Sequence, residues 1–300
     1  MRSVKNASRL NAWAGAASVA VAIFLVGLKL WALAATGALS VAASLTDSAL
    51  DLLMSLTNLV AILYATKPAD EDHAFGHTSV EDLAALAQAA FVAVSALTIG
   101  VAATGRLISQ DPPPLARETG GIAVMAISMA VTLVLVLWQR HVAARTGSRV
   151  VAADSLHYLT DLLPNAGAML ALAASALFAM GRIDSIVAIA ASVMLLAGAF
   201  RIGRGAFDAL MDRRAPPEVV HRVAAMTRDW PGVLGFHDLK TRTAGSKTFI
   251  QIHIELDGSQ PLAEAHAIGA GLRHAILEAF PSAEVIIHQD PFRRDEPASD

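Results

Sequence analysis

The chain has 300 residues, of which 55% are hydrophobic and only 16% are charged. Soluble proteins carry roughly 25% charged residues, so this composition predicts an integral membrane protein with a polar appendage. The net charge of −3 argues against a nucleic-acid partner, and the absence of cysteine excludes disulfides and thiolate metal ligands.

Six stretches are long and apolar enough to cross a bilayer, which needs about 20 residues. They run over residues 12–33, 40–66, 83–108, 120–138, 150–180 and 183–206. Lysine and arginine are distributed eleven to three between the two sets of connections. This bias predicts that both termini lie in the cytoplasm.

The composition becomes polar after Asp212, and Pro216-Pro217 marks a boundary. Periodicity predicts helices over residues 218–227 and 262–280, and strands over 235–242, 248–256 and 283–288. The order αββαβ is typical of a small open-faced α+β sandwich. We therefore expect an all-α six-helix transmembrane domain over residues 1–212, an α+β cytosolic domain over 213–290 and a disordered tail over 291–300.

Two short motifs place ionisable groups inside predicted spans. Each motif holds two residues four apart, so its side chains share one helix face. An isolated carboxylate at the bilayer centre costs at least ~2.5–3.5 kcal/mol, so these groups need a compensating partner. Three carboxylates and one imidazole suit tetrahedral Zn²⁺ and also admit Cd²⁺, Fe²⁺ or Mn²⁺. The four candidate ligands are Asp47, Asp51, His157 and Asp161.

A simpler explanation is that these acids face a water-filled lumen or pair with Lys29 or Arg106. We favour a metal because two cations are too few for four acids once Asp154 is counted. Asp154 lies three residues before His157, and two roles are open for it. It either orients the imidazole as an acceptor or caps the helix at the cytoplasmic surface. Pro164 can kink the same span.

The connection KPADEDHAFGHTSVEDL contains a second candidate site. Asp70, His73 and His77 are spaced three and four apart, which suits one metal in a tight loop or at a helix start. Glu71 or Asp72 could add an oxygen ligand. The alternative is a solvated charged loop whose acids favour the N-terminus of the next helix.

Five of the ten histidines lie within about fifty residues of the final domain. They are His237, His253, His266, His274 and His288, with Asp238 and Asp290 close by. Strand histidines can present imidazoles from one sheet to a shared metal. Any one of these histidines taken alone would usually be a surface residue. Because five occur close together in a chain without cysteine, we favour metal binding.

Three stretches of the chain resemble the cation diffusion facilitator family. They are TDSALD with LHYLTD, then PADEDHAFGHTSVEDLAAL, then GFHDLKTR with FIQIHIEL and IIHQDP. The likeness is greatest to the bacterial ferrous-iron/zinc efflux branch. It implies a six-helix transporter of the bacterial inner membrane that dimerises through metallochaperone-like αββαβ cytosolic domains.

The resemblance also implies roles for individual residues. Asp47, Asp51, His157 and Asp161 would form the transport site, and Asp70, His73 and His77 the loop site. A binuclear cytosolic site would use His237, His253, His288 and Asp290, with His266 as a further ligand. One departure is Ser79, where close relatives often carry a lysine that pairs near Asp212. This dimer brace is therefore in doubt.

We expect proton-coupled export of Zn²⁺, with Fe²⁺ and Cd²⁺ as further candidates, since metals and protons compete for the same ligand atoms. Zn²⁺ would be both substrate and regulatory ligand, and the partners would be a second copy, lipid, metal ions and protons. No G-x-x-x-x-G-K-[ST] loop supports an ATP-driven pump. A passive cation channel and a membrane metal sensor remain as other classes.

Overall fold

A computed structural model of the chain describes residues 2–36, 39–109, 119–160, 162–163 and 183–292. The chain divides into two compact units: one is Ser8–Phe207, and the other combines the N-terminal residues up to Ala7 with the chain from Asp208 onwards.

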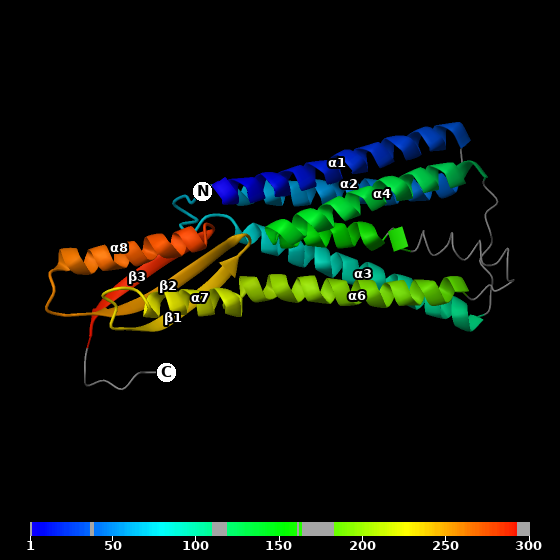
Figure 1. The fold of residues 1–300 in the computed structure, drawn as a ribbon. Helices are drawn as coiled ribbons and strands as arrows, with labels where there is room; N and C mark the ends of the chain where they lie inside the picture. The colour runs from blue at the N-terminus through cyan, green and yellow to red at the C-terminus, as the bar shows by residue number, and fades with distance from the viewer. Residues whose placement is uncertain (1, 37–38, 110–118, 161, 164–182, 293–300) are drawn as a thin grey trace. The chain divides into compact units, whose positions relative to one another are not determined.

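Long helices make up the first unit (Figure 1). They are α1 (Arg2–Thr36), α2 (Leu39–Ala65), α3 (Ser79–Ser109), α4 (Thr119–Thr146) and α6 (Ile183–Leu210). Another helical stretch covers residues 149–160 and is called the 149–160 helix below. Within the described residues, five helices are long and apolar enough to cross a membrane. They coincide with five predicted spans, whereas much of the predicted span 150–180 lies outside the described residues.

Several helices extend beyond the apolar stretch that predicted them. Helix α1 begins at Arg2 instead of residue 12, and α4 continues to Thr146 instead of ending at 138. Hydropathy marks only the part of a helix that lipid can surround. Polar residues with good helix propensity continue the same helix beyond its lipid-facing part. A prediction from hydropathy alone therefore underestimates the length of the helix.

Small residues fill many of the contacts between these helices. Ala85, Ala153 and Ala206 form one buried cluster, and the Cα of Gly203 leaves room for Ala89. Lipid tails are as apolar as leucine, so helices in a membrane associate mainly through close packing of small side chains. Larger side chains complete the interior, in one cluster around Ile62, Val142 and Val150 and in another around Leu135, Val136 and Tyr158.

The second unit has the predicted order αββαβ. Its elements are α7 (Pro217–Arg228), β1 (Gly235–Ala244), β2 (Lys247–Leu256), α8 (Leu262–Ala279) and β3 (Ala283–Pro291). The sheet order is β1-β2-β3, with β1 antiparallel and β3 parallel to β2. Gly245, at φ 54°, allows the tight turn between β1 and β2.

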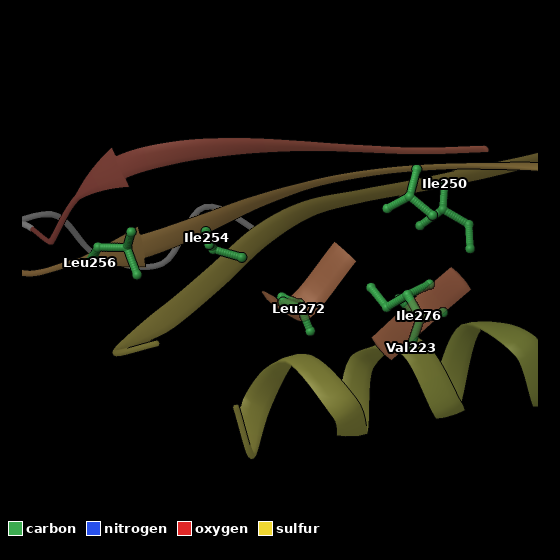
Figure 2. Close-up of a cluster of buried hydrophobic side chains, with 7 residues drawn as sticks. Val223, Ile250, Ile254, Leu256, Leu272 and Ile276 are labelled. Atoms are coloured by element: carbon green, nitrogen blue, oxygen red, sulfur yellow. The ribbon is translucent and has the colours of Figure 1, made fainter. Parts of the chain in front are cut away.

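Alternation along β2 separates the two faces of this sheet. Ile250, Ile252, Ile254 and Leu256 are buried, while the residues between them point to the other face. Figure 2 shows the buried face packed on Val223 of α7 and on Leu272 and Ile276 of α8. Both helices thus cover one face, and the opposite face carries the histidine of β2.

Two leucines of α8 provide a matched test of this core. Leu272 is fully buried, whereas Leu262 is 81% exposed. We expect Leu272→Ala to lower the free energy of unfolding by about 2–5 kcal/mol, because it leaves a cavity. Leu262→Ala should change it by less than about 0.5 kcal/mol. Urea unfolding of a fragment starting at residue 208, followed by circular dichroism, measures both; equal effects would contradict this core.

Candidate metal sites

The structure brings one predicted ligand pair of the membrane site together. His157 Nε2 on the 149–160 helix lies 3.1 Å from Asp51 Oδ1 on α2. The two side chains are only 3% and 13% exposed, and the imidazole has its edge against Phe91 of α3. Lys29 of α1 donates to Ser48 Oγ at 2.6 Å, so a cation also lies beside this helix.

The other two predicted ligands of this site are not described at the side-chain level. Asp47 belongs to α2, one helical turn before Asp51, but its side chain lies outside the described part of the chain. Asp161 and Pro164 also fall outside it. The four-ligand site therefore stays a prediction at these positions.

The reversal between α4 and the 149–160 helix sets the position of His157. Gly147, at φ 70°, donates its N–H to Ala143 O and ends α4. Ser148 Oγ accepts from Val151 N at 3.4 Å and so caps the next helix. A capping role for Asp154, one of the two predicted from the sequence, is wrong because Asp154 lies within the helix.

Asp154 is instead the centre of a buried hydrogen-bond network and is only 2% exposed. Its Oδ1 accepts from Asn58 Nδ2 at 2.8 Å and from Gln88 Nε2 at 3.2 Å. Its Oδ2 accepts from Ser18 Oγ and from Gln139 Nε2, each at 2.5 Å. The donors come from α2, α3, α1 and α4, and sequence reasoning missed all four because each is a lone polar residue in an apolar span.

The predicted loop triad converges. The ligand atoms of Asp70, His73 and His77 all lie within 4.8 Å of one another. Asp70 Oδ1 is 3.3 Å from His73 Nδ1, and Asp70 Oδ2 is 3.4 Å from His77 Nε2. The His77 side chain is 1% exposed and packs edge-on against Tyr64, whereas Glu71 and Asp72 are exposed.

A lysine already occupies part of this triad. Lys67 Nζ donates to Asp70 Oδ2 at 2.6 Å. This hydrogen bond holds the pKa of Asp70 well below its ordinary value and raises the pKa of Lys67. Asp70 is therefore a carboxylate throughout the physiological pH range, and a metal has to compete with the ammonium group for it.

Strand register assembles the cytosolic cluster. His237 of β1 is opposite His253 of β2, which is opposite His288 of β3. Neighbouring ring centres are 5.2 and 4.6 Å apart. The carboxylate of Asp290 lies close to all three imidazoles. One of its oxygens is 2.9 Å from His253 Nδ1 and 3.6 Å from His237 Nε2, and the other is 3.1 Å from His288 Nε2.

A bulge in β1 lies directly next to this cluster. The β1–β2 register shifts between His237 and Lys240, and Asp238 takes a positive φ of 51°. A bulge bends its strand and redirects the adjacent side chains. The carboxylate of Asp238 forms an ion pair with Lys240 and not with the three imidazoles.

The structure adds Glu255, which sequence reasoning missed. Its Oε1 lies 3.0 Å from His237 Nδ1. In the register of β2 and β3, Glu255 lies opposite Asp290. The signal was present in the sequence, because Glu255 is two residues after His253 and strand residues two apart share a face.

The remaining histidines do not join these clusters. His266 is exposed on α8, in the helical layer, and is not among the cytosolic residues whose ligand atoms converge. His274 pairs with Glu278 on the same helix, and His141 stacks on Trp138. A role for His266 stays a prediction.

Comparison with known proteins identifies the family. The model of the cation efflux transmembrane domain matches residues 16–211, and that of the cation efflux protein cytoplasmic domain matches residues 215–292. The chain belongs to the cation efflux family. It is thus a multi-pass membrane transporter and not an enzyme, as the motifs predicted, and its dimer-forming cytoplasmic domain supports a homodimer.

Individual relatives agree with this assignment. The cation-efflux pump FieF of Yersinia pestis (strain Pestoides F) is 42% identical over 282 residues, which are 93% of each chain. A solved zinc form of the zinc transporter CzrB is 36% identical and covers 29% of this chain and 100% of its own, with a TM-score of 0.27. The metal-bound C-terminal domain of the CzcD transporter from Thermotoga maritima is 29% identical and covers 26% of this chain and 93% of its own, with a TM-score of 0.25.

Removal of Lys67 tests the competition at the loop of this cation efflux protein. We expect Lys67→Met to raise the Zn²⁺ affinity of the loop a few-fold, because the metal no longer displaces an ammonium group from Asp70. Zinc titration in a background lacking His253 and His157 measures it. The control is Lys240→Met, which removes a lysine from the exposed Asp238. An unchanged or lower loop affinity in Lys67→Met would show that the ammonium does not compete.

Proposed function

We propose that this protein exports Zn²⁺, and also Fe²⁺ or Cd²⁺, from the cytoplasm in exchange for protons. The observation that carries this proposal is the buried contact of His157 Nε2 with Asp51 Oδ1 in a member of the cation efflux family. Imidazole and carboxylate without thiolate form a donor set that Zn²⁺ accepts. The name of CzrB as a zinc transporter supports the same choice.

The spacing of the pair suits a metal of this kind. Two ligand atoms about 2.0–2.1 Å from a tetrahedral Zn²⁺ lie about 3.3–3.4 Å from each other. The observed separation of 3.1 Å therefore has to widen by only a few tenths of an ångström. The loop triad is wider, because its ligand atoms lie within 4.8 Å of one another and its two imidazoles face different oxygens of Asp70.

Proton exchange follows from the same two atoms. At this separation either a proton or a metal ion can lie between His157 Nε2 and Asp51 Oδ1, but not both. Metal ligands must be deprotonated, so metal entry releases protons and proton entry releases metal. With Asp47 and Asp161 as the other ligands, an inward proton gradient would drive the metal outwards.

We also propose how the chain lies in the membrane and which part of it carries out which task. The charge bias of the connections supports a bacterial inner membrane orientation with both termini in the cytoplasm. Residues 1–212 would carry out transport, and residues 213–290 would bind metal and dimerise. The tail predicted to begin at residue 291 cannot start there, because Pro291 belongs to β3 and Phe292 N–H donates to Leu256 O. The loop triad would then receive metal on the cytoplasmic side.

Flux through the purified protein in proteoliposomes tests the transport site. We expect Asp51→Ala and His157→Ala to reduce Zn²⁺ flux driven by an imposed pH gradient to background, because each removes a ligand and a proton acceptor. His141→Ala is the control, since this imidazole is exposed and stacks on Trp138. Intact proton-dependent flux in either site variant would refute the assignment.

We propose a regulatory role for the cytosolic cluster. Three imidazoles surround Asp290 on the face of the sheet that the helices leave uncovered. Transport itself needs no ligands in this domain. Metal binding by His237, His253, His288 and Asp290 would draw the two cytosolic domains of a dimer together and raise turnover when cytosolic metal is high.

Substitution of the central imidazole tests this role. We expect His253→Ala to shift the rise of turnover towards higher Zn²⁺ concentrations, because it removes the group between His237 and His288. His274→Ala provides the control, as its ring is exposed and pairs with Glu278 on α8. The regulatory role fails if both variants show the wild-type dependence of rate on Zn²⁺ concentration.

A further inference from the structure

The two helices that carry Asp51 and His157 are joined by further buried polar contacts. Asn58 Nδ2 of α2 donates to Asp154 Oδ1 at 2.8 Å, and Ser55 Oγ is hydrogen-bonded to Tyr158 Oη at 2.8 Å. From the first pair to the second, the contacts advance in opposite directions along the two helices, and His157, which contacts Asp51, is the residue next to Tyr158. We call the pairs Asn58–Asp154 and Ser55–Tyr158 the polar ladder.

The ladder is anchored to the rest of the bundle at Asp154. Besides Asn58, the carboxylate accepts from Ser18 of α1, Gln88 of α3 and Gln139 of α4. All four donors are buried and fall within candidate membrane spans. Gln88 Oε1 also accepts from Asn58, and Ser18 Oγ from Gln139, so the donors hold one another.

These bonds add a directional restraint to the apolar packing of the 149–160 helix, which contributes Val150, Val151, Ala153 and Tyr158 to buried clusters. Helix rotation by one residue is about 100° and its translation about 1.5 Å, either of which breaks a hydrogen bond. Asp154 is the position at which the rotation and axial position of this helix are tied to four other helices at once.

We infer that Asp154 is a positioning residue for transport: its hydrogen bonds from four helices hold the 149–160 helix in the register that places His157 Nε2 against Asp51. The inference rests on the proposed transport site. It assigns to Asp154 no metal ligation, and it requires hydrogen-bonding ability at this position, not a charge.

The geometry indicates which substitution keeps the ladder and which breaks it. Among the described residues Gln139 Oε1 has no hydrogen-bond partner. Rotation of that amide would let it accept from the new N–H group of Asp154→Asn, while the remaining oxygen accepts from Asn58 and Gln88. Asp154→Leu has a similar size but removes the acceptor that all four donors share.

The experiment measures KM and kcat for Zn²⁺ flux of the full-length protein in proteoliposomes. We expect Asp154→Leu to raise KM about 10–100-fold, the usual effect of losing a group that orients a metal ligand. Asp154→Asn should stay close to wild type. Asn58→Leu breaks the ladder from the opposite helix and should raise KM in the same way, also if Asp154→Leu fails to fold. Thr57→Ala is the matched control, since Thr57 is exposed and bonds to its own helix.

Each outcome decides between the roles. A wild-type KM in Asp154→Leu or Asn58→Leu, with only a lower melting temperature, would show that the ladder merely stabilises the bundle. A KM in Asp154→Asn as high as in Asp154→Leu would show that the charge is needed and would overturn the inference. Asp51→Ala runs in parallel: if it retains flux, the proposed transport site itself is wrong, whereas if it loses flux while Asp154→Leu keeps its KM, only the positioning role fails.

Discussion

The free-energy cost of a carboxylate in lipid governs the arrangement of the membrane unit. Two acids in this unit meet that cost in different ways. Asp154 has both oxygens saturated by four neutral donors, so it has nothing left to offer an ion. Asp51 instead faces His157 at 3.1 Å, in the contact on which the proposed transport site rests. The first acid is thereby a fixed part of the fold, and the second belongs to the proposed exchangeable site.

The three candidate metal sites share a degree of preorganisation. Their imidazole nitrogens and carboxylate oxygens lie between 2.9 and 3.6 Å apart without a metal. Binding therefore requires little movement of the ligands, and most of its cost is the removal of what the ligands already hold. At Asp70 that is the ammonium group of Lys67. The loop triad therefore has a competitor for the metal within the chain itself.

Hydropathy and strand alternation predicted nearly every described element, because each is a periodic signal within one segment. Local spacing also predicted the loop triad and the cross-strand histidines. It did not predict the donors to Asp154, since Ser18, Asn58, Gln88 and Gln139 lie on four helices and no spacing along the chain relates them. Glu255 is a different omission: it follows His253 by two residues, and strand periodicity was sufficient to find it.

The 149–160 helix is restrained at two levels, and this limits how the transport site can open. Near its start, Arg149 forms an ion pair with the buried Asp82 of α3 at 2.6 Å. One turn later Asp154 ties it to four helices. Because His157 follows these restraints by less than one turn, the helix cannot turn His157 away alone. For the proposed transport site to open to each side in turn, either the attached helices would move together or Asp154 would exchange its hydrogen-bond partners.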